Sequence, residues 1–235
     1  MNAPLSAGCF VTGTDTGIGK TRAAVALLQA LAARGLRAVG MKPVASGCEA
    51  TPAGLRNDDA LALIAASAGA PDYALVNPYA FAPPVAPHLA ARAAGCGIDF
   101  AHIEDCARRL AAGADWLVVE GVGGWRVPLG AGGELATLAQ RLGLPVVLVV
   151  GLRLGCLNHA LLSADAILAA GLPLAGWIAN RIDPDMALAD DNLATLTALL
   201  PAPCLGTLAW CPLPASHAGG LDLRPLLAAA AAQRS

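Results

Sequence analysis

One segment of the chain, residues 13–21, constrains the fold more than any other. It reads Gly13-Thr14-Asp15-Thr16-Gly17-Ile18-Gly19-Lys20-Thr21. A short apolar run, Cys9-Phe10-Val11, precedes it, and an Ala/Leu-rich stretch with helical periodicity, Arg22 to Arg34, follows it. A strand, a glycine-rich loop and Gly-Lys-Thr at the start of a helix are together typical of a phosphate-binding loop. The segment therefore predicts a strand–loop–helix unit that binds a nucleotide.

The residue types in this loop suit the chemistry of phosphate binding. Glycines let backbone N–H groups approach an anion, and the helix N-terminus adds a partial positive charge. We expect Lys20 to contact the β- and γ-phosphates and the Thr21 hydroxyl to ligate Mg²⁺. Five residues separate Gly13 from Gly19, one more than the usual spacing. The alternative, a glycine-rich turn capped by a lysine, is disfavoured because the flanking segments also fit a phosphate-binding loop.

Short apolar runs alternate with longer Ala/Leu-rich segments along the rest of the chain. We expect strands at 9–11, 38–41, 116–120, 146–150, 175–179 and 204–208. We expect helices at 21–34, 58–68, 103–112, 135–142, 158–170 and 190–200. Several strands are apolar on both faces, as in a parallel sheet that helices cover. The pattern predicts an α/β fold, a doubly wound and mostly parallel sheet in a single domain (1–235), with loops at the proline-rich stretches 78–87 and 201–214.

The composition excludes several classes of partner. A net charge of −2 with 14% charged residues offers no basic stripe for nucleic acid. The longest strongly apolar run, 144–152, is too short to span a bilayer and contains a proline and a glycine. No charged N-terminal region precedes an apolar core, and the seven cysteines lack the spacing of metal sites. We expect a cytoplasmic protein with reduced thiols that binds neither nucleic acid nor membrane.

Polar residues follow the expected strands, at the edge where such sheets bind ligands. Lys42 follows the second strand, and Glu120 ends the third and is followed by the glycine-rich residues 121–123. The lysine could neutralise charge during phosphoryl transfer, and the glutamate could face Mg²⁺ beside a second loop that approaches phosphate. If Lys42 stood alone, an ordinary solvated lysine beside a turn proline would be the favoured interpretation. At the helix between them, Asp58 or Asp59 could be the N-cap.

Six motifs, in this order, resemble those of one family. They are GTDTGIGKT (13–21), KPVASG (42–47), RNDDALAL (56–63), VEGVGGW (119–125), VVGLRLGCLNHA (149–160) and GWIAN (176–180). The set is similar to the dethiobiotin synthetases, ATP-dependent ligases of biotin biosynthesis with a P-loop NTPase fold. The resemblance covers Phe10 to about Trp210. The longer spacing in the first loop is itself a trait of that family.

The resemblance implies a reaction in three steps that uses ATP and Mg²⁺. An amine of 7,8-diaminononanoate takes up CO2 as a carbamate, and ATP phosphorylates the carbamate. The second amine then displaces phosphate and closes the cyclic urea of dethiobiotin. By this resemblance Lys42 would be the catalytic lysine beside the carbamate, and Lys20 would stabilise the transferring phosphoryl group.

The resemblance also implies which residues hold the metal, the nucleotide and the substrate. Thr21, Asp59 and Glu120 would hold Mg²⁺, which leaves Asp58 as a candidate cap. The residues implied for the nucleotide are Gly17, Ile18, Gly19, Lys20, Thr21, Arg22, Asp59, Glu120, Gly121, Val122, Gly123, Asn180, Arg181, Ala209, Trp210 and Cys211, with Asn180 and 209–211 at the adenine. The residues implied for the substrate are Thr16, Ser46, Gly155, Cys156, Leu157 and Asn158.

The last four of these, residues 155–158, open a predicted helix. Free N–H groups at a helix start can bind a carboxylate without an arginine, and no nearby Arg or Lys is an obvious partner for the substrate's carboxylate. In the family this region receives the carboxylate tail from the neighbouring subunit, so the resemblance implies a homodimer with shared sites. From the residues alone, Asn158 fits a plain helix cap equally well. Cys156 and His159 lack a third ligand nearby, which disfavours a metal site.

Three residues of this chain depart from the family pattern. Gly17 stands where many members carry Glu, Asn192 where some carry an aromatic residue, and Ala209 where a proline is usual.

An amidoligase of the cobyrinate-amidating kind shares the ATP core but is expected to need a glutaminase region, for which the residues after Trp210 are too few. A partitioning-type ATPase switch typically has a second lysine early in the loop, where this chain has Thr14-Asp15-Thr16, and an amphipathic C-terminal anchor, whereas residues 226–232 are a short Ala-rich stretch. Both classes are therefore disfavoured.

Overall fold

The computed structural model describes residues 7–211 and 220–232. In these ranges a six-stranded sheet has the order β10-β9-β8-β1-β7-β2. Its strands are β1 (Gly8–Gly13), β2 (Ala38–Met41), β7 (Trp116–Glu120), β8 (Val146–Leu152), β9 (Leu174–Arg181) and β10 (Cys204–Leu208). Every neighbouring pair in this sheet is parallel. The strands expected from the sequence are therefore confirmed, although several are longer than expected.

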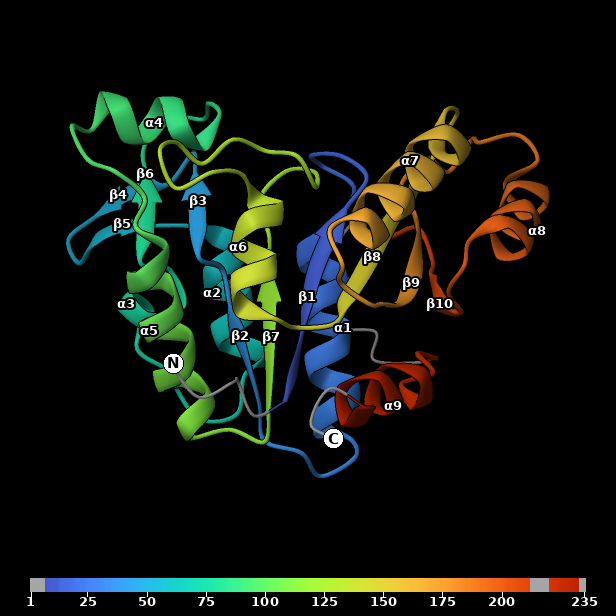
Figure 1. Ribbon diagram of the computed structural model, residues 1–235, viewed down its shortest axis with the longest axis horizontal. Coiled ribbons are helices and arrows are strands. Elements are labelled where there is room, and N and C mark those ends of the chain that lie inside the picture. Colours follow the sequence, from blue (N-terminus) through green and yellow to red (C-terminus); the bar gives the residue numbers. More distant parts are fainter. Residues whose placement is uncertain (1–6, 212–219, 233–235) are drawn as a thin grey trace.

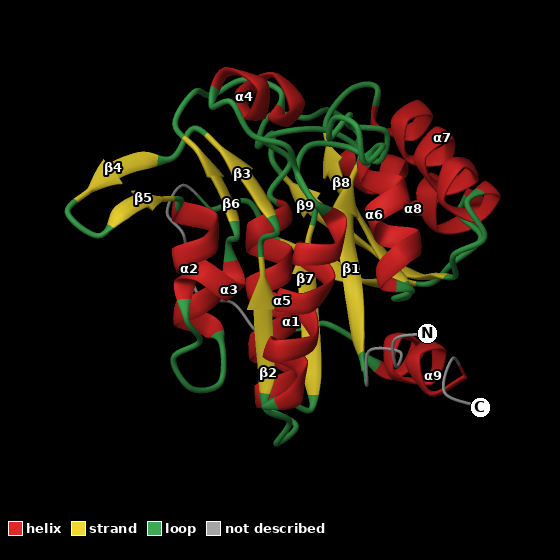
Figure 2. Cartoon of the chain, turned by 60° about the vertical axis from the view of Figure 1, so that its left-hand side comes forward, coloured by secondary structure: helices red, strands yellow, loops and turns green. Residues whose placement is uncertain are grey.

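Helices cover both faces of this sheet, as Figures 1 and 2 show. One face carries α5 (Phe100–Ala112), α6 (Leu135–Leu142), α7 (Cys156–Ala169) and α8 (Ala189–Leu199), and the other carries α1 (Lys20–Ala32) and α9 (Arg224–Ala232). Two buried apolar clusters fill the space between the layers. Phe10 belongs to the first and Val11 to the second, so successive residues of β1 enter opposite clusters. The doubly wound α/β fold is confirmed.

Smaller elements lie beside the main sheet. Beyond β2 come α2 (Asp58–Ala66), α3 (Tyr73–Val76) and α4 (Pro87–Ala93), a parallel pair of short strands, β3 (Val44–Ser46) and β6 (Tyr79–Phe81), and a hairpin of β4 (Glu49–Thr51) and β5 (Gly54–Arg56). The loop expected over 78–87 is thus wrong in part, because residues 79–81 pair with β3 and Pro87 begins α4. Proline suits the first turn of a helix, where its missing N–H is not needed. No helix in the described ranges is both long and apolar enough to cross a bilayer.

The direction of the strands brings their loops together. Because the six strands of the main sheet are parallel, all their carboxyl ends lie at one edge, the upper edge in Figure 1. The phosphate-binding loop follows β1, Lys42 follows β2, and Glu120 ends β7 at that same edge. β1 and β7 are direct neighbours and β2 lies next to β7. Three segments that are distant in sequence therefore meet at one place.

Candidate active site

The glycine-rich loop joins β1 directly to α1, and Gly19 is the N-cap of this helix. Its φ of +82° lies in the left-handed region, which favours glycine. A Cβ at this position would lie 2.1 Å from Nδ2 of Asn180. The chain therefore needs glycine here for two reasons, backbone conformation and the close approach of β9. No acidic residue occupies the first turn of α1, so the positive end of the helix dipole is left for an anion.

A pocket of about 440 Å³ opens beside this loop. It is lined by Thr16, Gly17, Gly19, Lys20, Thr21, Arg22, Lys42, Ala45, Ser46, Asn57, Asp59, Glu120, Val122 and Gly123. The structure thus brings together loop residues and the polar residues that follow β2 and β7. Ala45 and Asn57 were not expected from the sequence. Ile18 and Gly121, also expected at the nucleotide, are buried and do not line the pocket.

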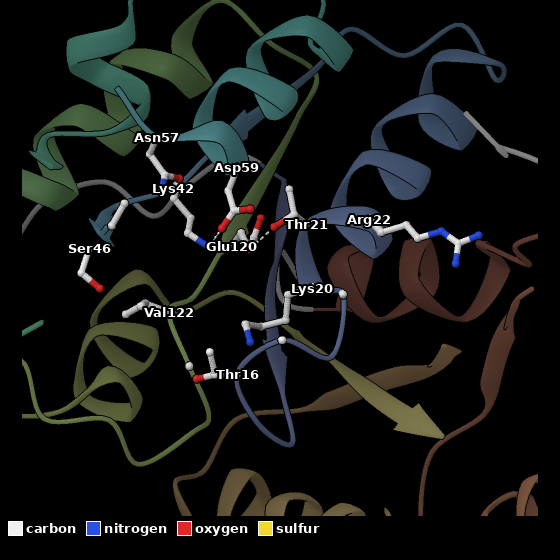
Figure 3. A pocket seen from close by; sticks show the side chains of 14 residues that line it. Thr16, Lys20, Thr21, Arg22, Lys42, Ser46, Asn57, Asp59, Glu120 and Val122 are labelled. Atoms are coloured by element: carbon white, nitrogen blue, oxygen red, sulfur yellow. Dashed lines mark hydrogen bonds and ion pairs between the residues drawn. The ribbon is translucent and has the colours of Figure 1, made fainter. Parts of the chain in front are cut away.

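Lys42 lies at the centre of a charged cluster that Figure 3 shows. Its Nζ is 2.5 Å from Oε1 of Glu120 and 2.9 Å from Oδ2 of Asp59. The Thr21 hydroxyl donates a hydrogen bond of 2.8 Å to the same Glu120 oxygen. The three residues expected to hold a cation therefore converge, and a lysine ammonium lies among them.

Burial sets the electrostatics of the cluster. Glu120 is 1% exposed, and burial raises its pKa, which Lys42 offsets only in part. Burial alone would lower the pKa of Lys42, but the two carboxylates outweigh burial and raise it above its usual value. Burial opposes ionisation of Asp59 as well, yet Lys42 keeps the pKa of Asp59 below its usual value. Lys42 is therefore a cation and Asp59 an anion at neutral pH.

Lys20 has a different environment. Its Nζ donates to the backbone carbonyl of Asp15 at 2.7 Å, so the side chain folds back over its own loop. Burial, reinforced by repulsion from Lys42, lowers the pKa of Lys20 to about 8. A phosphate placed in the loop would offer this ammonium a charged partner and would raise the pKa again.

A partly buried hydrogen-bond network supports both Lys42 and the helix that carries Asp59. Asn77, itself buried, donates from Nδ2 to the Lys42 carbonyl at 2.7 Å. The Tyr73 hydroxyl donates to Oδ1 of Asn77 at 2.9 Å and accepts from the Asn57 amide at 2.8 Å. Asn57 in turn caps α2 by accepting from the Ala60 amide at 3.2 Å.

This network corrects one expectation. The N-cap of α2 is Asn57, not Asp58, which lies in the first turn of the helix. Asn and Asp are about equally good caps, so composition could not separate these neighbours. No sequence signal pointed to Tyr73 or Asn77, because their role depends on α3 packing beside β2.

Beside Arg22, which lines the pocket, the side-chain amide of Asn180 on β9 links the glycine-rich loop to α1. Its Nδ2 donates to the Ile18 carbonyl at 2.8 Å, and its Oδ1 accepts from Nη1 of Arg22 at 3.1 Å. Arg181 follows on β9 and pairs with Asp190 of α8 instead. Residues 209–211, expected near the adenine, follow β10 and do not line the pocket.

The segment that opens α7 lies outside the pocket. Gly155 is the N-cap with φ +95°, so Asn158 lies inside the helix and is not its cap. The Cys156 amide donates to the Arg153 carbonyl at 3.0 Å, and nothing in the described ranges accepts from the amides of Leu157 and Asn158. Arg153 is a nearby cation that was overlooked, but its guanidinium pairs with Asp15 of the phosphate-binding loop.

Comparisons with known proteins fit this geometry. A family model described as an AAA domain matches residues 7–217. The ATP-dependent dethiobiotin synthetase BioD of Pseudomonas paraeruginosa is 58% identical over 220 residues, which cover 92% of this chain and 96% of that relative. The BioD of Xanthomonas euvesicatoria is 56% identical over 216 residues, covering 91% of this chain and 96% of that protein.

Solved structures support the fold alone. The cell division protein MinD of Aquifex aeolicus superposes with a TM-score of 0.53 at 15% identity, covering 88% of this chain and 83% of MinD. A ParA family ATPase of Chlorobium tepidum superposes with a TM-score of 0.51 at 12% identity, covering 88% of this chain and 86% of that ATPase. These two structures show the fold alone, at 12–15% identity, whereas the two ligases are 56–58% identical over more than nine tenths of the chain. The chain belongs to the ATP-dependent dethiobiotin synthetase family.

Proposed function

We propose that this protein closes the ureido ring of dethiobiotin from 7,8-diaminononanoate, CO2 and ATP, releasing ADP and phosphate. Its family membership indicates an ATP-dependent ligase of the cyclo-ligase kind. The observation that carries the proposal is the position of Lys42. This buried cation lies between two carboxylates at one end of a phosphate-binding loop, where charge develops during phosphoryl transfer.

We propose a Mg²⁺ site formed by Thr21, Asp59 and Glu120. Oε2 of Glu120 is buried and has no hydrogen-bond partner among the described residues, so a further cationic or donor group fits beside it. In the described ranges no three His, Cys, Asp or Glu side chains form a group that could bind a metal. The proposed site therefore combines two carboxylates, of Asp59 and Glu120, with the Thr21 hydroxyl. Oxygen ligands of this kind suit Mg²⁺, which keeps several waters and binds substrate phosphates. When bound, the ion would neutralise charge on the phosphates.

ATP would occupy the loop with its β- and γ-phosphates on the free N–H groups at the start of α1. Lys20 would exchange its bond with the Asp15 carbonyl for the phosphate oxygens. The γ-phosphate would then lie toward Lys42, and the nucleoside would extend toward Arg22 and Asn180 at the opposite end, with 209–211 and Arg181 beyond them. No enzyme nucleophile is required, because positioning of the reactants and neutralisation of charge are sufficient to catalyse phosphoryl transfer.

The carbamate would form at the Lys42 end of the pocket. One substrate amine attacks CO2 and loses a proton, and a carbamate oxygen then attacks the γ-phosphorus while ADP leaves. The second amine attacks the carbonyl of this mixed anhydride, phosphate leaves, and the ring closes with loss of a proton. Because its pKa is raised, Lys42 would act as a cation that stabilises the carbamate rather than as a base. Thr16 and Ser46 line the same pocket and could contact the substrate.

We also propose a homodimer that shares its sites. The amides of Leu157 and Asn158 at the start of α7 could bind the carboxylate tail of a substrate held by the partner. Leu154, directly before this site, is 96% exposed, and Leu162 of the same helix is also exposed. Apolar side chains beside a free helix N-terminus suit an interface between two copies.

Complementation between subunits tests this shared site. A Lys42→Met subunit and a Gly155→Phe subunit should each be inactive as homodimers. A purified heterodimer should regain one of its two sites, formed by the intact pocket of one subunit and the intact α7 of the other. An inactive heterodimer, or a monomer with full activity, would contradict the shared site.

The reaction itself is tested with ¹³C-bicarbonate, 7,8-diaminononanoate and Mg-ATP, followed by mass spectrometry. We expect labelled dethiobiotin, ADP and phosphate in equal amounts, without any need for glutamine. An amidoligase would require glutamine or ammonia, and a switch would hydrolyse ATP without forming a labelled product. Either of those results would refute the proposed function.

A further inference from the structure

An ion pair joins the phosphate-binding loop to the segment that follows the neighbouring strand of the sheet. β8 lies beside β1, and Arg153 is the first residue after β8. Its Nη2 pairs with Oδ2 of Asp15, a residue 138 positions earlier in the chain. The other carboxylate oxygen of Asp15, Oδ1, accepts from the Thr16 amide at 2.7 Å. One carboxylate therefore bonds the backbone of the loop on one side and the end of β8 on the other.

The arginine of this pair stands on regular structure. The last two residues of β8, Gly151 and Leu152, are buried. The Arg153 carbonyl accepts at 3.0 Å from the amide of Cys156, a buried residue at the start of α7. The backbone of Arg153 is thus held between a strand and a helix, and side chains that such elements carry are placed more precisely than those of free loops.

The charges of the pair suit a loop that receives phosphate. The Thr16 amide, and after it the Arg153 guanidinium, hold the pKa of Asp15 below its usual value. Asp15 is therefore an anion at neutral pH, and an unpaired anion in this loop would repel a phosphate. Thr16 lines the pocket, whereas Asp15 and Arg153 do not. These two residues are placed to act on a ligand through the loop and not by contact with it.

Phosphate in the proposed binding mode removes one of the bonds that hold Asp15. In the structure Nζ of Lys20 donates to the Asp15 carbonyl at 2.7 Å, and this ammonium would turn to the phosphate oxygens. The Thr14 amide stays bonded to the Val149 carbonyl at 3.1 Å, but this bond fixes only the start of the loop. The pair with Arg153 then remains as the side-chain link between Asp15 and the end of β8.

We propose that Arg153 is a positioning residue of the phosphate-binding loop. By pairing with Asp15 it holds Thr16 and the glycines that follow in place when Lys20 turns to the phosphates, and it neutralises a carboxylate beside them. This inference rests on the proposed nucleotide site and adds to it a residue that lies outside the pocket. It predicts that loss of the guanidinium weakens nucleotide binding only while the Asp15 carboxylate is present.

A double-mutant cycle on ADP affinity, measured by calorimetric titration at neutral pH, tests this role. Arg153→Met removes the charge, and we expect it to weaken ADP binding about fivefold, the upper range for a half-exposed ion pair. In an Asp15→Asn background the same substitution should weaken ADP binding by less than about twofold, because no carboxylate is left to hold. Arg37→Met breaks an exposed ion pair at the start of β2, the opposite edge of the sheet, and is the matched control that should leave ADP affinity unchanged.

Two results would overturn the proposal. One is a loss of less than about twofold in Arg153→Met, which would mean that the pair does not position the loop. The other is a loss of about twofold or more that persists in the Asp15→Asn background, which would mean that the guanidinium attracts the phosphates directly. Thermal melting checks that each variant is folded, and Arg153→Gln, which is also neutral, repeats the cycle if Arg153→Met is not.

The titration separates this inference from the proposed function. It needs no turnover, so the wild-type protein can fail to form labelled dethiobiotin while the cycle still gives the expected result. In that case the proposed reaction fails and the role of Arg153 stands. A wild-type protein that does not bind ADP would instead refute the nucleotide site, and the role of Arg153 with it.

Discussion

Replacing Lys42 by methionine should destabilise the protein, and the loss should depend on pH. The substitution removes the ammonium 2.5 Å from Glu120 and leaves a carboxylate that is 1% exposed with only the Thr21 hydroxyl as partner. Breaking a buried ion pair from one side costs about 3–5 kcal/mol. We expect about 3 kcal/mol at pH 8, because Thr21 still donates and Asp59 is partly exposed.

The sign of the pH dependence follows from Glu120. Burial raises its pKa in the folded state, and loss of the Lys42 cation raises that pKa further. An acid with a raised folded-state pKa stabilises the fold below its unfolded pKa and loses this contribution as pH rises through the folded value. The cost of Lys42→Met should therefore shrink as pH falls from 8 toward 5, by at most about 1.4 kcal/mol per pH unit.

Urea unfolding at pH 8, 6.5 and 5.5 measures this cost as a difference in unfolding free energy. The double variant Lys42→Met/Glu120→Gln should be more stable than Lys42→Met alone at pH 8, since a neutral amide replaces the unpaired carboxylate. Arg37→Met, which breaks the exposed pair with Asp115, should show no pH dependence in this range, because Asp115 stays ionised there both with Arg37, which lowers its pKa to about 2, and with the ordinary carboxyl pKa to which it returns without Arg37. A cost below about 1 kcal/mol at pH 8, or one independent of pH, would refute the account of the cluster.

Three other predictions concern the pocket. Because the pKa of Lys20 is about 8 and phosphate should raise it, ADP binding at pH 8.5 should take up protons, seen as a dependence of the calorimetric heat on the buffer's ionisation enthalpy. Equal heats in all buffers would contradict this. Asp59→Asn should raise the Mg²⁺ concentration needed for half-maximal activity, whereas Asp58→Asn should leave it nearly unchanged; equal effects would defeat the distinction. Tyr73→Phe removes two hydrogen bonds of the Asn77 network and should lower kcat about tenfold, with little change in ADP affinity. An unchanged kcat would show that this network does not support Lys42 in catalysis.

Much of the site could be predicted because parallel strands impose it. Apolar runs located β1, β2 and β7, and the residue that follows each run had to lie at one edge of the sheet. That rule alone predicts that Lys42 and Glu120 lie beside the glycine-rich loop. The short direct bond between them was not predictable, because it depends on side-chain directions that only packing fixes.

The parts that sequence reasoning missed depend on short or long-range contacts. β3 and β6 have three residues each and are paired across a long separation, so neither has a periodic pattern of its own. Asn57 was missed as a cap because two aspartates beside it are equally good candidates. Arg153 was overlooked because its partner, Asp15, lies in the loop after a different strand.

The most direct test of the account is turnover by Lys42→Met beside its affinity for ADP. If the buried cation between Glu120 and Asp59 stabilises the reacting groups, dethiobiotin formation should fall by at least about 1,000-fold. In the proposed binding mode ADP would contact the loop and not Lys42, so its dissociation constant should change by less than about threefold in a variant whose circular dichroism matches wild type. Turnover within about tenfold of wild type in that folded variant would contradict the assignment of Lys42 as the catalytic cation.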